Sequence, residues 1–572
     1  MNIFEYIEVE FTSILTRLAE QSVLPRELDA SRVVFELPRD VSHGDLATNA
    51  AMILSKPAQK SPRDLAAILV AEFAKIDGVV GVDIAGPGFI NLRVSPIFWA
   101  QQITDIFDSG LNYGRSKVGS GARVNIEFVS ANPTGPLHAA HARGAVIGDA
   151  LAGLMEFCGW DVTREYYIND AGGQVDVLAR STYLRYCEAL GRDIGRIPEG
   201  LYPGEYLKDV GAALAQQIGD SYLDKVEAEW MHDVRDFAID RIMLVIKQDL
   251  DSLGIHMDVF SSERANVQSG AVQRAIDQLQ AGGHLYTGVL APPKGKEPED
   301  WEPREQLLFR ASDFGDDTDR PLQKSDGSWT YFAADVAYHL NKLERTKGQL
   351  INIFGADHGG YMKRMNAAVA ALSGQQNMLD IKLCQLVNLL DNGTPVKMSK
   401  RAGTFVTVRD VIDTVGADVI RFIMLTRRND QTLDFDFAKV TEQSRDNPVF
   451  YVQYAHARAC SVLRQCEAPD NADLALLTAE PELALLKQLA SWPKLVESAA
   501  MAHEPHRIAF YLVDLASHFH SLWNAGRDNP ALRFIIEDDQ AATDARLMLV
   551  KATSLVIRTG LNMLSIDALE EM

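Results

Sequence analysis

The spacing of hydrophobic positions changes several times along the chain, and each change predicts a different kind of element. In the middle of the chain, short strand-like runs alternate with apolar stretches of helical length. One strand–helix–strand unit is predicted from three consecutive segments, which are the strand-like run Arg123–Phe128, an apolar helix from His138 to Phe157 and the run D-V-T-R-E-Y-Y-I. The run Q-L-I-N-I-F-G, a helix and the run I-K-L-C-Q-L-V-N predict a second. Two such units imply a doubly wound parallel sheet, with the ligand site beyond the carboxyl ends of its strands.

The segments on either side have other patterns. Residues 1 to about 112 combine helical spacing with two strand-like runs, G-V-D-I-A and G-F-I-N-L-R-V, which a Gly-Pro-Gly turn separates. From about 446 to 572, apolar residues recur at i, i+3 and i+4, which predicts helices. We therefore expect a multidomain α/β protein. It has a Rossmann-like, doubly wound parallel-sheet core, an α+β N-terminal domain and an all-α C-terminal helical bundle.

The pattern divides the chain into four expected parts, residues 1–112, 113–405, 406–445 and 446–572. In the second part, about 175 to 300 is expected to be a mostly helical, charged insertion between the halves of the sheet. The third part is a small connecting module that carries Arg421, Arg427 and Arg428.

Composition narrows the class of protein. A chain of 572 residues is too long for one core, and 47% hydrophobic with 23% charged residues is ordinary for a globular protein. No apolar run is long enough to span a bilayer, and the acidic, amphipathic N-terminus is unlike a leader peptide. The five cysteines are scattered without a C-x-x-C pair, which argues against a disulfide framework or a zinc ribbon. A cytoplasmic protein is expected.

The net charge of −22 counts against a nucleic-acid partner at first sight. A nucleic-acid binder needs a local basic surface, however, and not a basic chain. The charge therefore weakens an RNA-binding hypothesis without excluding it.

The segment A-N-P-T-G-P-L-H-A-A-H, from Ala131 to His141, is the strongest candidate for chemistry. It joins the first predicted strand to a long apolar helix, so its histidines stand at a helix N-terminus, where free N–H groups and the helix dipole favour anions. His138 and His141 are three residues apart and share one face of the first turn. Two imidazole donors there suit a phosphate chain whose charge grows during reaction.

This segment resembles the HIGH motif of class I aminoacyl-tRNA synthetases, in the form that arginyl-tRNA synthetases have. Lys397–Arg401, K-M-S-K-R, resembles their second motif, KMSKS. Alone, a pair of histidines is more often a helix cap or part of a core, and a basic stretch is more often a solvated loop. Both motifs in this order make the resemblance specific, and it extends over essentially the whole chain.

The resemblance implies an arginine–tRNA ligase of the bacterial type. Such an enzyme joins L-arginine to ATP, as the Mg²⁺ complex, and transfers the arginyl group from arginyl-adenylate to the 3′ end of tRNA(Arg). No tightly bound metal or organic cofactor is expected, and the family suggests a monomer. The N-terminal domain is expected to contact the tRNA D-loop, the module at 406–445 the tRNA stem, and the C-terminal bundle the anticodon.

The resemblance also implies site residues, which we give by role. The expected catalytic residues are His138, His141, Lys397 and Lys400. ATP-binding positions are Pro133, Thr134, Gly135, His138, Ala140, His141, Asp357, His358, Met398, Ser399 and Lys400. Arginine-binding positions are Glu127, Ser130, Asn132, His141, Tyr331 and Asp335. Asn169 and Gln174 are expected to support that site. Positions expected to bind tRNA are Phe89, Asn91, Arg427, Arg428, Tyr454 and Arg458.

Some of these residues have a simpler interpretation. Phe89 can be a core residue and Asn91 a strand-end amide. Tyr331 and Asp335 can be a buried tyrosine and a surface aspartate near a helix N-terminus. Ala140 departs from the family, because the third position of the motif is normally glycine and lies against the adenine ring. The run of aspartates from Asp313 to Asp319 lacks the glycine and glutamate of a calcium loop, so a solvated loop is expected there.

Alternatives from other classes make different demands on the sequence. A cysteinyl enzyme would need zinc-ligating cysteines, and a glutamyl enzyme would need a basic pocket where Glu127 and Asp335 stand. A smaller adenylyl-transferring enzyme would not need the C-terminal bundle. A non-catalytic RNA-binding paralogue predicts damaged motifs, whereas both histidines and both lysines are present.

Overall fold

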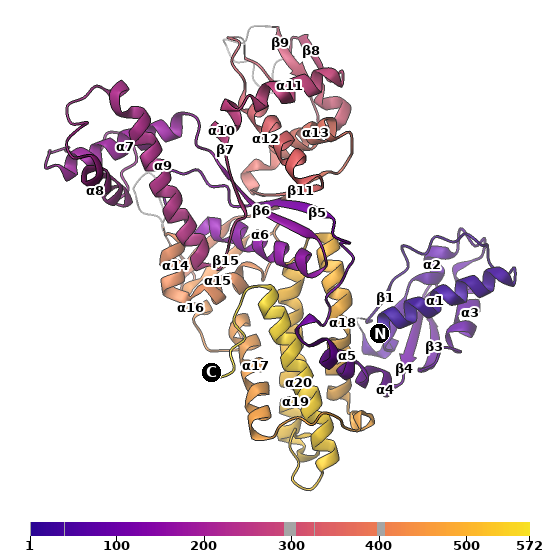
Figure 1. Ribbon diagram of the computed structural model, residues 1–572. Coiled ribbons are helices and arrows are strands. Elements are labelled where there is room, and N and C mark those ends of the chain that lie inside the picture. Colours follow the sequence, from indigo (N-terminus) through magenta and orange to yellow (C-terminus); the bar gives the residue numbers. More distant parts are fainter. Residues whose placement is uncertain (1, 39, 291–304, 325, 397–405) are drawn as a thin grey trace.

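The structure, a computed structural model, describes residues 2–38, 40–290, 305–324, 326–396 and 406–572 (Figure 1). A central parallel sheet lies between a long helical bundle on one side and two lobes on the other. The N-terminal domain lies beside the bundle. The expected fold class is confirmed in its three main parts.

The central sheet has five parallel strands in the order β12–β11–β5–β6–β7. Their bounds are β5 (Arg123–Glu127), β6 (Asp161–Ile168), β7 (Val259–Ser262), β11 (Gln349–Gly355) and β12 (Leu379–Cys384). From β5 the chain moves toward β7, and later from β11 toward β12. This reversal makes the carboxyl ends of β5 and β11 the switch point at which such sheets bind ligands.

Helices cover both faces of this sheet. Because right-handed crossovers in opposite directions place their helices on opposite faces, α6 (Ala139–Phe157) lies on one face and α13 (Met362–Ser373) on the other (Figure 1). α12 (Tyr331–Thr346) packs against β5, β11 and α13. α6 is buried on most of its surface, because it also contacts the C-terminal bundle through α18 (Glu480–Ala502) and α20 (Gln540–Met563). Its run of small apolar residues permits this close packing on all sides.

The expected helical insertion at about 175 to 300 is only partly correct. The helices α7 (Gly173–Ala189), α8 (Tyr206–Ile218) and α9 (Glu227–Ser252) form a lobe, in which the rings of Tyr183 and Trp230 stack 4.0 Å apart. The next residues, however, form β7, which extends the central sheet, and α10 (Glu263–Gln268). The second half of the fold therefore begins earlier than the pattern indicated.

A second lobe contains α11 (Ala271–Ala281) and the antiparallel strands β8 (Leu285–Gly288), β9 (Gln306–Phe309) and β10 (Arg320–Pro321). Here the expectation of a solvated aspartate loop is correct for Asp313 and Asp317, which are exposed, but not for Asp316 and Asp319. The Asp316 side chain is 1% exposed and accepts two hydrogen bonds from the Arg320 guanidinium, at 2.7 and 2.8 Å. Asp319 accepts from Ser312 and Tyr286. Asp316 and Asp319 therefore stabilise this lobe through their hydrogen bonds.

The N-terminal domain is a four-stranded antiparallel sheet with helices on its apolar face. Its elements are α1 (Ile3–Glu20), β1 (Phe35–Glu36), β2 (Leu46–Thr48), α2 (Ala50–Leu54), α3 (Pro62–Phe73), β3 (Val79–Ala85) and β4 (Phe89–Val94), with strand order β1–β2–β4–β3. The expected final strand pair is confirmed. α4 (Pro96–Ala100) and α5 (Gln102–Ser109) then lead to the bundle, which contacts the domain through the Lys487–Asp45 ion pair at 2.5 Å.

The connecting module joins the central sheet to the bundle. It contains α14 (Val408–Val415), α15 (Ala417–Met424), β15 (Leu433–Asp436) and α16 (Phe437–Val440). Its strand β15 pairs in parallel with β13 (Val387–Asp391), which precedes β14 (Thr394–Pro395) in the part of the chain before the module. Arg421 is 1% exposed. Its guanidinium donates to Asp149 of α6 at 2.5 Å and to the carbonyls of Leu253 and Leu564. Arg421 thus stabilises the junction of three parts of the molecule.

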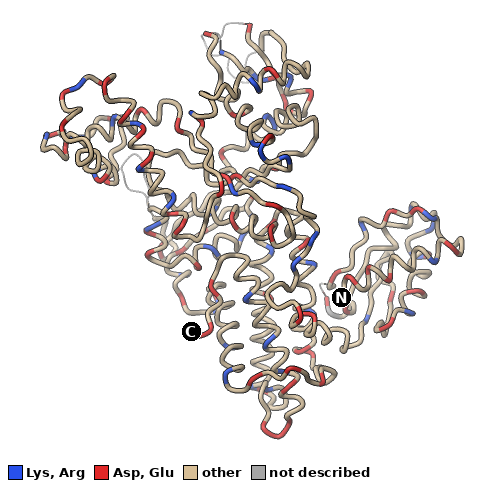
Figure 2. Tube along the Cα trace, viewed as in Figure 1, with Lys and Arg blue, Asp and Glu red and all other residues tan. Residues whose placement is uncertain are grey.

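The C-terminal bundle consists mainly of α17 (Pro448–Gln465), α18 (Glu480–Ala502), α19 (His506–Asp528) and α20 (Gln540–Met563). None of the helices in the described ranges is long and apolar enough to cross a membrane. Basic and acidic positions are interspersed over most of the chain, with an acidic run, Glu537–Asp539, in the loop before α20 (Figure 2).

Candidate active site

The candidate site begins at the turn that follows β5. Val129 and Ser130 have φ of +68° and +39°, a left-handed conformation that is unusual for a β-branched residue. The Ser130 hydroxyl donates to Glu127 Oε1 at 3.1 Å and accepts the Tyr167 N–H at 3.0 Å. These bonds hold the strained turn against β6. The turn then directs the following Asn-Pro-Thr-Gly-Pro segment toward the N-terminus of α6.

His138 and His141 lie together at that N-terminus. Their rings stack with centroids 3.6 Å apart and an interplanar angle of 21°, which confirms that they share one face. The backbone N–H of His138 donates to His141 Nδ1 at 3.3 Å. A neutral His141 therefore carries its proton on Nε2, where it is a hydrogen-bond donor at the positive end of the helix dipole.

The same turn pairs with the segment that follows the second motif. His138 and Thr407 form an antiparallel bridge, the Ala139 N–H donates to the Val406 carbonyl at 3.0 Å, and the Val408 N–H donates to the Leu137 carbonyl at 2.8 Å. Lys397, Met398, Ser399 and Lys400 lie outside the described residues. The backbone that follows them is nonetheless fixed directly against the two histidines.

The segment before the second motif is also fixed. β13 and β14 form a hairpin, and the carboxylate of Asp436 accepts the N–H groups of Asn392 and Gly393 at its turn, at 3.1 and 2.8 Å. Asp436 is 4% exposed, so this support comes from within the connecting module.

Ala140 has room beside it. The side chain is half-buried, and one turn later a methyl group added to Gly144 would meet no atom within 4 Å. A face without bulky groups on the first two turns of α6 is what a flat ring lying against the helix requires. Pro133 is buried, whereas Thr134 and Gly135 are half-buried, and the Thr134 carbonyl accepts the Tyr206 hydroxyl at 2.6 Å.

We predict that Ala140→Val raises the ATP KM sharply while the protein stays folded, because two further methyl groups would occupy the adenine face. Ala140→Gly should be neutral or slightly favourable for ATP binding, at a cost of up to ~1 kcal/mol of helix stability. Steady-state kinetics with varied ATP, together with thermal unfolding, measures both effects. An equal ATP KM for the two variants would place Ala140 away from the adenine ring.

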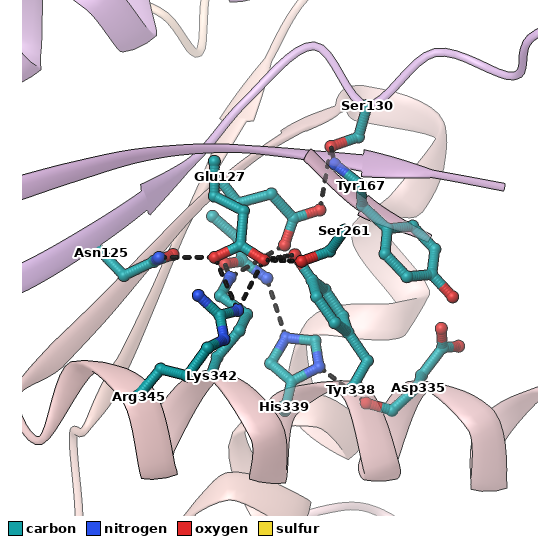
Figure 3. A network of polar contacts seen from close by, with 12 residues as sticks. Asn125, Glu127, Ser130, Tyr167, Ser261, Asp335, Tyr338, His339, Lys342 and Arg345 are labelled. Carbon is teal, nitrogen blue, oxygen red and sulfur yellow. Dashed lines mark hydrogen bonds and ion pairs between the residues drawn. The ribbon is translucent and has the colours of Figure 1, made fainter. Parts of the chain in front are cut away.

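A buried network of charged groups lies between the sheet and α12 (Figure 3). Glu127 is 3% exposed and forms an ion pair with Lys342 at 2.8 Å. Glu165 is fully buried and accepts from Arg345, Asn125, Ser261 and Tyr338. Glu127 and Glu165 therefore each have a cation from α12.

Asp335 has a different environment, in the first turns of the same helix. It is half-buried and accepts a short hydrogen bond from the Tyr361 hydroxyl. Burial and the negative charges of Glu263 and Glu127 raise the pKa of Asp335 well above its usual range, although Arg364 opposes this shift. Tyr331 is 75% exposed. The simpler interpretation of this pair is thus wrong, since the tyrosine is exposed and the aspartate is not on the surface.

Glu263 did not stand out in the sequence. It begins α10, is 8% exposed, and has a pKa raised by burial and by Asp170. After burial, its negative charge is the largest cause that raises the pKa of Asp335. Only its position directly after β7 could have indicated a role, and β7 was not predicted.

The remaining predicted residues occupy the same edge of the sheet. Asn132 is exposed and donates to Gln174 Oε1 at 3.0 Å, while Asn169 directly follows β6. The Asp357 and His358 side chains follow β11 and are 84% and 57% exposed. The structure brings together, at this edge of the sheet, residues that are far apart in sequence.

The residues expected to contact tRNA lie in three different parts of the molecule, and the Arg428 carbonyl accepts from Arg143 of α6 at 2.8 Å. Phe89 is 40% exposed and Asn91 is buried in the middle of β4, so Phe89 is not core and Asn91 does not end a strand. Arg427 is exposed beside a cavity of about 450 Å³, and the Arg428 side chain pairs with Asp430 at 3.0 Å. In α17, the Arg458 guanidinium lies 4.1 Å from the Tyr454 ring centroid and 4.8 Å from that of Trp523.

Among the described residues, no group of three or more His, Cys, Asp or Glu side chains is arranged to hold a metal ion.

Comparison with known proteins identifies this architecture. Three family models match: the arginyl tRNA synthetase N terminal domain over residues 6–94, the tRNA synthetases class I (R) catalytic domain over 102–442, and the DALR anticodon binding domain over 452–572. The fold and the site are therefore those of a class I aminoacyl-tRNA synthetase.

Whole-length relatives identify the family within this class. The chain is 54% identical to an arginine–tRNA ligase of Roseobacter denitrificans and 57% identical to one of Cereibacter sphaeroides, each alignment covering 100% of both proteins. The arginyl-tRNA synthetase structure of Thermus thermophilus has the same fold, with a TM-score of 0.74 over 98% of this chain and 99% of that one at 21% identity. The chain belongs to the arginyl-tRNA synthetase family.

Proposed function

We propose how this arginine–tRNA ligase uses the edge of its central sheet. The substrates are arginine, ATP and tRNA(Arg). In the first step the arginine carboxylate attacks the α-phosphate of Mg-ATP, which gives arginyl-adenylate and pyrophosphate. In the second step the 3′-terminal ribose of tRNA(Arg) takes the arginyl group and AMP leaves. The protein contributes mainly positioning and charge stabilisation to both steps.

The guanidinium of arginine is proposed to bind between Asp335 and Glu263. This assignment is supported by the raised pKa of both carboxyl groups, which comes first from burial and then from neighbouring negative charge that a bound cation would relieve. Glu127 already has Lys342 as its partner. We therefore assign Glu127, Ser130 and Asn132 to the amino-acid end of arginine, and the exposed Tyr331 to a position over its side chain.

The phosphates of ATP are proposed to lie at the N-terminus of α6. His141, through its Nε2–H, and His138 would donate to the phosphate at which charge accumulates. Pro133, Thr134 and Gly135 would line the approach, and Ala140 the adenine ring. Lys397 and Lys400, with Met398 and Ser399, would act on the pyrophosphate. Asp357 and His358 would face the adenosine or the tRNA end.

The tRNA is proposed to contact three separate parts of the molecule. Phe89 and Asn91 would meet the D-loop, Arg427 and Arg428 the stem, and Tyr454 and Arg458 the anticodon. Phe89, Arg427 and Arg428 are exposed, and aromatic and guanidinium groups suit unstacked bases and phosphates. We propose domain boundaries after residues 112, 405 and 445, which separate the N-terminal domain, the catalytic domain, the connecting module and the bundle. We further propose that the enzyme is a monomer and that it acts in the cytoplasm, where charged tRNA is used.

Pyrophosphate exchange with each amino acid, measured with and without tRNA, tests this function. We expect exchange with arginine and at least ~10³-fold lower kcat/KM with citrulline, whose urea group has the same shape without the charge. A signal that depends on tRNA would be typical of the family. Comparable exchange with citrulline or lysine would contradict the guanidinium site.

Arginine binding should release a proton from the carboxyl pair. Because the raised pKa leaves Asp335 protonated above the range of an ordinary aspartate, and the guanidinium requires the ionised form, binding displaces that proton. The arginine KM should therefore fall as the pH rises above about 4, until Asp335 is ionised in the free enzyme. Calorimetric titration in two buffers of different ionisation enthalpy measures the release. No release anywhere between about pH 5 and about pH 8 would oppose this assignment.

A further inference from the structure

Lys342 is a fully buried cation that the reaction described above does not use. It lies in α12, two turns after Asp335, and its side chain is 0% exposed. The ammonium donates to Glu127 Oε2 at 2.8 Å and to Asn352 Oδ1 at 2.7 Å (Figure 3). Glu127 ends β5 and Asn352 lies in β11, so Lys342 connects α12 to both strands of the switch point.

From Lys342, hydrogen bonds continue back to the turn that carries Asp335. Asn352 Nδ2 lies 2.9 Å from His339 Nε2, and His339 Nδ1 lies 2.8 Å from the Asp335 carbonyl oxygen. Since a carbonyl only accepts, Nδ1 carries the proton and Nε2 accepts from the amide. Burial and Lys342 lower the pKa of His339 to about 4, so the ring stays neutral and the direction of every bond is fixed.

The charges around Lys342 are balanced on one side and unbalanced on the other. Glu165 and Arg345, which face it from β6 and α12, form their own pair at 2.8 Å. The Tyr338 ring centroid lies 5.2 Å from the ammonium. Glu127 is the carboxylate that Lys342 contacts directly, and the charges of Lys342 and Arg345 also lower the pKa of Glu165. This leaves Asp335 and Glu263 as the carboxyl groups that a substrate cation can neutralise.

We infer that Lys342 is a positioning residue for the arginine site, because it holds Glu127 and, through Asn352 and His339, the turn of α12 that carries Asp335. This inference rests on the proposed arginine site. It assigns no contact with substrate to Lys342. It predicts instead that Glu127 and Asp335, at the two ends of the arginine site, no longer keep their relative positions when the ammonium is removed.

The test is Lys342→Met, which keeps the length of the side chain and removes its charge and donors. At saturating ATP and tRNA, the arginine KM should rise at least tenfold, while the ATP KM stays within about twofold of the parent value. A merely structural defect would change both KM values or the amount of folded protein. Arg546→Met is the matched control, because it breaks a buried ion pair with Glu482, 2.7 Å long, inside the bundle. It should leave the arginine KM unchanged.

A double-mutant cycle keeps the inference testable if Lys342→Met folds poorly. Glu127→Gln with Lys342→Met leaves no buried charge without a partner. Because Lys342 also acts through Asn352 and His339, the double variant should have a higher arginine KM than Glu127→Gln alone, with the ATP KM unchanged. An arginine KM equal to that of Glu127→Gln alone, or an unchanged KM in a folded Lys342→Met, would overturn the inference. Asp335→Asn distinguishes a failure of this inference from a failure of the proposed arginine site, because a normal arginine KM in that variant would refute the arginine site itself.

Discussion

Replacing His141 by alanine should lower the turnover of arginine activation by about 10²–10³-fold, the usual loss when one donor to a developing charge is removed. The Nδ1 atom of His141 accepts from the His138 N–H, so the donor is at Nε2, in the first turn of α6. Charge on the α-phosphate is larger in the transition state than in bound ATP. The ATP KM should therefore change much less than kcat.

Two further variants make the His141 result specific. His141→Asn keeps an acceptor for the His138 N–H and a donor at a similar position, so it should recover part of the lost turnover. His232→Ala removes an exposed histidine of α9 that pairs with Asp233, and turnover should be unaffected. A large rise in ATP KM at constant turnover would show that His141 binds the ground state instead.

Replacing Asp335 by asparagine should act selectively on arginine. The amide keeps the shape of the side chain and an acceptor for the Tyr361 hydroxyl, but it loses the charge that pairs with a guanidinium. Removing one member of a buried charge pair costs about 2–5 kcal/mol, so the arginine KM should rise at least ~30-fold. Steady-state kinetics with arginine and ATP varied separately provides the measurement.

A matched carboxylate controls for the Asp335 substitution. Asp317→Asn removes an exposed carboxylate that pairs with Lys363, and neither KM should change. If Asp335→Asn raises the KM of both substrates equally, the side chain supports α12 and does not bind arginine.

The sequence predicted those parts of the fold in which a long apolar pattern and a motif coincide. β5, α6 and β6 follow directly from the hydrophobic runs around the two histidines. β7 was missed because it has four residues, Val-Phe-Ser-Ser, all half-buried, at the edge of the sheet. A strand so short, with two serines, has no alternation that distinguishes it from a loop.

Burial of charged residues was the other limit of sequence analysis. Arg421 and Arg427 look alike in the sequence, yet one is buried at a junction of three elements and the other is exposed. Lys342 and Glu127 are 215 positions apart, so only the fold brings them together. The motifs located the ATP side of the site. The charge balance of the arginine side depends on partners from β5, α10 and α12 that no local pattern connects.

The contacts of Arg421 also determine when this enzyme can become active during its synthesis. Its guanidinium joins Asp149 in the catalytic helix to the carbonyl of Leu564, which leaves the ribosome 143 residues after Arg421. N-terminal parts fold first as a chain emerges. Until Leu564 has emerged, a buried cation of the catalytic region still lacks one of its acceptors, and α6 lacks its contact with α20. Nascent chains should thus reach full protection of α6 only after α20 and Leu564 have emerged, which limits adenylate formation by shorter chains.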